Sequence, residues 1–251
     1  MNVVRGTWLV FHRQVHQIVR SPIWIFLSIL DPLVYLFLFA PLLRRALDAP
    51  TTGAAYDTFV PGLLVLLALF GGMFAGFAML VELRAGMVER ARVTPMSTVA
   101  LLLGRCLKDV VVLLFQAVIV TVVAMLFGMT VRLGELLLAY LLVGLIALFM
   151  SALSNGAALA LKTEGILSPL INTLGHPLLM LSGILLPLAL APVWLQNVAQ
   201  ANPFSWTVDG MRALFEGNAG DPVVWQSFLI VGTLTVVSVF WASRQFARAI
   251  R

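Results

Sequence analysis

The chain has 251 residues, of which 61% are hydrophobic and only 11% are charged, and its mean hydropathy is +1.02. A water-soluble domain of this length could not cover its surface with so few charged residues, so the composition excludes a soluble globular protein. It predicts an all-α integral membrane protein. The formal net charge of +5 indicates attraction to anionic membrane lipid, and no basic patch with interleaved aromatic residues points to a nucleic acid.

Residues 3–20 come first and predict a helix that lies on the membrane surface. Trp8, Phe11, Val15 and Ile18 recur at helical spacings of three and four, and the basic side chains lie largely on the other faces. Such an amphipathic helix is typical of the interface between lipid headgroups and acyl chains.

Apolar segments long enough to cross a bilayer follow. A hydrocarbon core of about 30 Å takes about 20 apolar residues of helix. Six segments qualify, and they are residues 22–43, 59–81, 110–129, 136–161, 166–190 and 224–243. No repeat of 20 to 50 residues interrupts this pattern, so we expect one membrane domain over residues 1–251.

The distribution of Lys and Arg predicts the orientation of these spans. An even number of spans leaves both termini on one side, and twelve basic residues fall on that side against four on the other. Because basic loops stay in the cytoplasm, we expect cytoplasmic termini in a bacterial plasma membrane.

Aspartate and proline interrupt the first span. Asp31 stands about nine residues into the hydrocarbon, where an ionisable residue costs a few kcal/mol and indicates a function such as lining the substrate pathway. Alternatively, Asp31 and Ser28 stabilise backbone that Pro32 has loosened. In the second span, Gly72 and Gly76 predict close helix packing within the subunit.

The only dense charge cluster lies between the second and third spans, in residues 82–109. Its periodicity predicts a helix that includes Glu82 and ends at Pro95. Thr94 and Pro95 suit the N-cap and first turn of a second helix, which carries Arg105 on its polar face. This pattern favours a coupling element outside the bilayer, and the alternative is a solvated loop without a partner.

This stretch resembles a motif of ATP-binding-cassette exporter permeases of the ABC-2 type, and most closely the subgroup that resembles daunorubicin-resistance permeases. The matching positions are Glu82, Arg84, Gly86, Glu89, Arg90, Val93, Thr94, Pro95, Ser97, Gly104 and Arg105. The resemblance implies a cytoplasmic helix pair that docks into a groove of a separate ATPase subunit. The residues that it implies for ATPase coupling are Glu82, Arg84, Gly86, Glu89, Arg90, Thr94, Pro95 and Arg105. Leu83 and Met87 depart from the family's usual charged or threonine residues.

The fourth and fifth spans carry polar groups. Ser151, Ser154 and Asn155 predict interhelical hydrogen bonds. The fifth span gathers small and polar residues within about 80° of one helical line, and these are Ser168, Asn172, Gly175, His176 and Ser182. Together with three prolines, this face predicts a bent helix that lines the substrate pathway. The alternative is a polar seam between neighbouring helices.

A second resemblance to the same family follows the fifth span, in residues 182–203 and in Asp209–Arg212. In that family, short outward-facing helices occur here. The resemblance implies a six-span permease subunit that pairs with a second permease subunit, expected to be identical, and with two copies of a cytoplasmic ATPase. It implies export of an amphiphilic drug, lipid or glycolipid.

Signals for other functions are missing. Lys162 and Thr163 do not follow a glycine as in a phosphate-binding loop, so ATP and Mg²⁺ are expected to bind only to the partner subunit. Cys106 is the only cysteine, and His12 and His16 have no third ligand nearby, so no metal site is expected. No catalytic constellation indicates an enzyme. A proton-coupled secondary transporter that uses Asp31 is the main alternative, although such proteins usually carry inverted repeats.

Overall fold

The computed structural model describes residues 3–20, 22–46, 51–86, 97–184 and 191–250. Within these ranges every regular element is a helix, which confirms the all-α fold class. The helices in chain order are α1 (Val3–Val19), α2 (Pro22–Ala46), α3 (Thr52–Arg84), α5 (Thr98–Leu126), α6 (Leu133–Leu161), α7 (Glu164–Met180), α8 (Val193–Gln200), α9 (Pro203–Phe215) and α10 (Pro222–Ile250).

Four of the described helices are long and apolar enough to cross a membrane. They cover residues 53–84, 98–126, 133–161 and 222–249. The first predicted span corresponds to α2, in which residues 26–39 form a shorter apolar helix. The fifth corresponds to α7, which ends at Met180 after 17 residues, and residues 185–190 of that predicted span lie outside the described ranges. The chain is therefore a multi-pass membrane protein, and the number of six spans stays a prediction.

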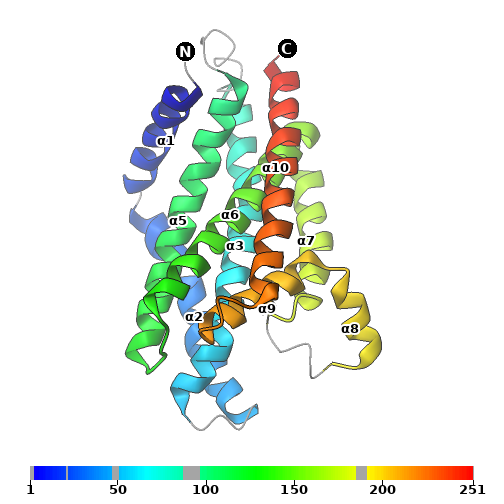
Figure 1. Cartoon of the computed structure of the whole chain (residues 1–251). Helices are drawn as coiled ribbons and strands as arrows, with labels where there is room; N and C mark the ends of the chain where they lie inside the picture. Colours follow the sequence, from blue (N-terminus) through cyan, green and yellow to red (C-terminus); the bar gives the residue numbers. More distant parts are fainter. Residues whose placement is uncertain (1–2, 21, 47–50, 87–96, 185–190, 251) are drawn as a thin grey trace.

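Helix α6 lies at the centre of the bundle, between α3 and α10, and α5 packs on another side of it (Figure 1). Glycines make the approach of α3 to α6 close, as the sequence predicted. A Cβ atom on Gly72 would lie 2.5 Å from Cβ of Met150, and one on Gly76 would lie 2.5 Å from Oγ of Ser154. Ser154 also donates a hydrogen bond to the carbonyl of Met73. Ser154 therefore joins α3 to α6 in the interhelical manner that was predicted.

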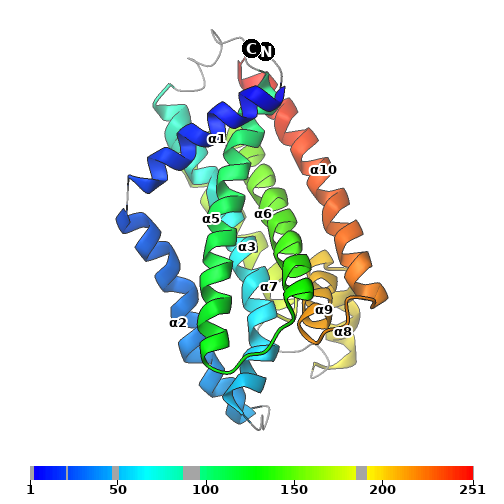
Figure 2. The same ribbon diagram turned by 60° about the vertical axis from the view of Figure 1, so that its left-hand side comes forward.

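The two ends of the bundle differ. Both termini, the end of α3 and the start of α5 lie at one end (Figure 1), and Figure 2 shows α1 crossing this end obliquely over α5. The short helices α8 and α9 lie at the opposite end, before α10, where the second resemblance placed short helices. The described helix ends that flank the predicted coupling segment and the helices of the predicted outward-facing motif therefore lie at opposite ends of the molecule.

The face of α1 that packs on the protein is not the tryptophan face. Gly6 and Gln14 are buried, and a Cβ atom on Gly104 of α5 would lie 2.6 Å from Cβ of Val10. Trp8 points outward with 62% of its surface exposed. This orientation leaves the indole available to the headgroup region that tryptophan prefers.

Candidate coupling site and transport cavity

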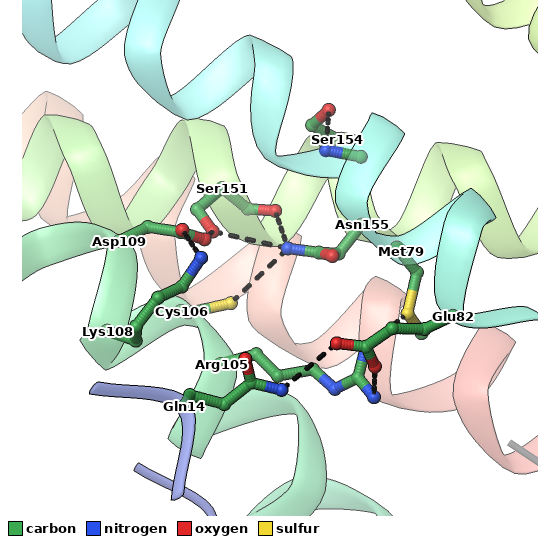
Figure 3. A network of polar contacts seen from close by, with 11 residues as sticks. Gln14, Met79, Glu82, Arg105, Cys106, Lys108, Asp109, Ser151, Ser154 and Asn155 are labelled. Carbon is green, nitrogen blue, oxygen red and sulfur yellow. Dashed lines mark hydrogen bonds and ion pairs between the residues drawn. The ribbon is translucent and has the colours of Figure 1, made fainter. Parts of the chain in front are cut away.

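An ion pair joins the two helices that flank the predicted coupling segment. The carboxylate of Glu82, near the end of α3, pairs with the guanidinium of Arg105 in α5 (Figure 3). Nε2 of Gln14 in α1 donates a hydrogen bond of 3.0 Å to Oε1 of Glu82. Only 18% of the Glu82 side chain and 13% of the Arg105 side chain are exposed. Three helices are thus tied together at one largely buried carboxylate.

A second, exposed ion pair lies beside the same segment. Nη1 of Arg84 lies 3.0 Å from Oε1 of Glu164 at the start of α7. The structure describes four of the predicted coupling residues, which flank residues 87–96. They are Glu82, Arg84, Gly86 and Arg105. Glu89, Arg90, Thr94 and Pro95 lie outside the described residues.

The boundaries of the two flanking helices differ from the prediction. Helix α3 ends at Arg84 rather than at Pro95, because Gly86 adopts a left-handed φ of 67° and its amide bonds back to the carbonyl of Leu83 at 3.1 Å. This is a common way for a glycine to end a helix. The helix that carries Arg105 begins at Thr98 with Ser97 as its N-cap, so the prediction of a helix running on from Thr94 is wrong. Oγ of Ser97 accepts the amide of Ala100 at 3.2 Å, as a serine N-cap does.

A polar network that the sequence analysis did not identify as a unit lies deeper in the bundle. Lys108 and Asp109 of α5 form an ion pair, and Oγ of Ser151 in α6 donates a hydrogen bond of 2.5 Å to Oδ2 of Asp109 (Figure 3). Nδ2 of Asn155 donates to Oγ of Ser151 at 3.2 Å. The predicted interhelical role of Ser151 is confirmed. The four-residue spacing of Ser151 and Asn155 was the available signal, but it did not indicate which helix they face.

Asp31 lines a cavity. Helix α2 continues through Pro32, and Asp31 is exposed on its surface. A cavity of about 310 Å³ lies beside it, between α2, α3 and α5. Its lining residues include Ser28, Phe70, Phe74, Lys108 and Gln116. The structure thus brings Asp31 near the polar groups of α5, which are far away in sequence.

The polar residues of α7 are largely exposed and bond to their own helix. Nδ2 of Asn172 donates to the carbonyl of Ser168 at 3.0 Å, and Nδ1 of His176 lies 2.8 Å from the carbonyl oxygen of Asn172. Gly175 is buried, and a Cβ atom there would lie 3.0 Å from Cε of Met73 in α3. The predicted face therefore divides into an exposed polar strip and a close contact with α3.

Ser182 does not belong to this strip. Helix α7 ends at Met180, so the prediction that Ser182 continues the same helical face is wrong. Ser182 is fully buried in the turn that follows, where its Oγ donates to the carbonyl of Leu179 at 2.6 Å. The backbone leaves the helix here, and the 100° period no longer applies.

The residues from Asp209 to Arg212 make packing contacts between α9 and its neighbours, at the end of the bundle opposite the termini. Nη2 of Arg212 donates a hydrogen bond of 2.7 Å to the carbonyl of Gly183, which ties α9 to the turn after α7. Burial raises the pKa of Asp209, and the nearby guanidinium of Arg212, at 3.7 Å, partly opposes this rise. A Cβ atom on Gly210 would lie 2.2 Å from Oγ of Ser227, so α9 and α10 pack closely.

A model of the family described as ABC-2 type transporter matches residues 5–215. The chain belongs to this family. It is 29% identical over 206 residues to a chain named transport permease ycf38 in Cyanophora paradoxa, covering 79% of this chain and 70% of that one. It is 27% identical over 202 residues to the daunorubicin resistance ABC transporter permease protein DrrB1 of Streptomyces coeruleorubidus, covering 79% and 71%. It is 25% identical over 186 residues to a chain named multidrug ABC transporter permease YbhR in Escherichia coli K12, covering 73% of this chain and 50% of that one.

Family membership identifies the chain as an ABC transporter permease subunit. Subunits of this type form the membrane part of the transporter and are not themselves catalytic. They normally work with an ATP-binding subunit.

Proposed function

We propose that this permease exports an amphiphilic drug, lipid or glycolipid across a bacterial plasma membrane, driven by a separate cytoplasmic ATPase. Two ATPase subunits and a second, identical permease subunit complete the transporter. ATP and Mg²⁺ bind to the ATPase subunits, and this chain contributes the pathway and the coupling segment. Its termini lie in the cytoplasm.

The observation that carries the proposal is the ion pair between Glu82 and Arg105, which holds together the two helices at the edges of the coupling segment. A force applied by the ATPase between these helices reaches α3 and α5 together. Through the hydrogen bond from Gln14 to Glu82, it also reaches α1 at the membrane surface. Movement of these helices would change the cavity beside Asp31, which α3 and α5 both line.

The names of two similar proteins support an amphiphilic substrate. DrrB1 is named for daunorubicin resistance and YbhR for multidrug transport. Family membership favours ATP over a proton gradient as the energy source, since it normally includes an ATP-binding subunit.

Charge reversal in the coupling segment tests the proposal. We expect the variant that combines Glu89→Lys with Arg90→Glu to lower the recovery of the ATPase with tagged permease severalfold, because complementary charges at an interface become repulsive. ATP-driven export should fall in parallel, whereas membrane insertion stays normal. The control is Glu216→Lys, an exposed position just beyond the end of α9. Unchanged ATPase recovery and unchanged export in the double variant would contradict the proposal.

A further inference from the structure

The cavity between α2, α3 and α5 combines charged and aromatic groups (Figure 2 shows these helices). Its volume is about 310 Å³, and Ile18 of α1 also lines it. The polar groups come from α2 and α5, and they are Ser28, Asp31, Lys108, Asp109 and Gln116. The apolar part comes mainly from α3, with Leu66, Leu67, Phe70 and Phe74.

The charges in this cavity do not cancel. Lys108 is paired with Asp109, whose other oxygen accepts the hydroxyl of Ser151. In the described part of the chain, Asp31 takes part in no ion pair. The cavity therefore holds one carboxylate in excess. A carboxylate that has no paired cation attracts a positively charged group.

The aromatic residues face the same space. The ring centroids of Phe70 and Phe74 are 6.3 Å apart, and Phe74 is 50% exposed. Aromatic faces attract organic cations and also provide apolar contact area. An excess carboxylate beside exposed phenyl rings matches a ligand that has one positive charge and an apolar body.

We propose that this cavity is the entry site for organic cations with an aromatic or apolar body, with the charge held near Asp31 and the body against Phe70 and Phe74. The proposal rests on the export function proposed above and gives its substrate class. Phe70 also contacts His176 of α7 edge-on, with ring centroids 6.4 Å apart. Phe70 therefore both lines the cavity and contacts the exposed polar strip of α7.

A pair of probes with the same shape and opposite charges tests this proposal. Tetraphenylphosphonium and tetraphenylborate are titrated by equilibrium dialysis into the purified permease without any ATPase. We expect Asp31→Asn to weaken phosphonium binding about tenfold, the equivalent of one moderate ion pair. The affinity for borate should not fall, and Asp31→Glu should keep most of the phosphonium affinity. Phe74→Leu should weaken phosphonium binding severalfold while the charge at Asp31 remains.

Glu216→Gln serves as the control, because it removes the same charge beyond the end of α9, far from this cavity. It should change neither affinity. Unchanged phosphonium binding in Asp31→Asn, or an equal loss for both probes, would overturn the proposal. Since the assay contains no ATPase, its outcome is independent of the coupling experiment. Unchanged ATPase recovery in the charge-reversal variant would contradict the export mechanism but not the cation site. Unchanged phosphonium binding in Asp31→Asn would contradict the cation site but not the export mechanism.

Discussion

The ion pair between Glu82 and Arg105 and the ion pair between Arg84 and Glu164 lie near each other but differ in their access to water. The first pair has side-chain exposures of 18% and 13%, and the second has 59% and 44%. Removing one partner of a buried pair leaves an uncompensated charge and costs about 3 to 5 kcal/mol. An exposed pair contributes at most about 1 kcal/mol.

We therefore predict that Glu82→Gln lowers the free energy of unfolding by about 3 kcal/mol. Combining Glu82→Met with Arg105→Met should restore most of the loss, because no buried charge is then left alone. Reversible unfolding in detergent measures the free energy of unfolding of Glu82→Gln and of the double variant. Arg84→Gln is the matched control, with an expected loss below about 1 kcal/mol. Equal losses for Glu82→Gln and Arg84→Gln would show that burial does not distinguish the two pairs.

Helix α7 presents exposed polar side chains on the surface of the single subunit. Asn172 and His176 are exposed, and their hydrogen bonds to the backbone of α7 reduce the cost of an apolar environment. Leu170 instead lines a small apolar cavity with Met150 and Leu153 of α6. Positions 170 and 172 lie about 200° apart around the helix, so their side chains lie on opposite sides of α7.

If the polar strip of α7 lies near the axis between two permease subunits, cysteines there should form disulfides between subunits. In a Cys106→Ser background, we expect Asn172→Cys to give cross-linked dimers on oxidation and Leu170→Cys to give few, because α6 of the same chain lies beside Leu170. Gel electrophoresis without reducing agent measures the dimer. Cross-links at Leu170 alone would place the subunit contact on the other side of α7.

At the scale of the whole molecule, the two ends of the bundle carry different kinds of structure. Arg84 lies at the end that contains both termini, and Arg132 immediately precedes α6 at the opposite end. Their side chains are 59% and 81% exposed, so both sites are accessible to reagents. The excess of basic residues on the side of the termini predicts that this side is cytoplasmic.

Labelling of single cysteines tests this orientation. In the Cys106→Ser background, a membrane-impermeant maleimide should label Arg132→Cys in intact cells and Arg84→Cys only after the membrane is permeabilised. The physical reason is that basic segments near the ends of spans are retained in the cytoplasm. The opposite labelling pattern would reverse the proposed direction of the subunit in the membrane.

Composition and periodicity alone determined the membrane class, the helical fold and the position of the charge cluster. These properties are local, since a hydrocarbon environment forces the backbone into helices wherever apolar residues continue for long enough. The close packing at Gly72 and Gly76 was also predictable, because their four-residue spacing places them on one helical face. The end of α3 and the start of α5 were not predictable, because at a polar boundary water can satisfy the backbone of several alternative helix ends.

Only the tertiary structure decided which polar residues meet. Gln14, Glu82 and Arg105 come from three helices, and their contact depends on how those helices cross. Asp31 likewise lines a cavity with Lys108 because α2 packs beside α5. Helical periodicity gives the face on which a side chain lies but not the neighbour of that face, since the neighbour is chosen by packing among segments distant in sequence.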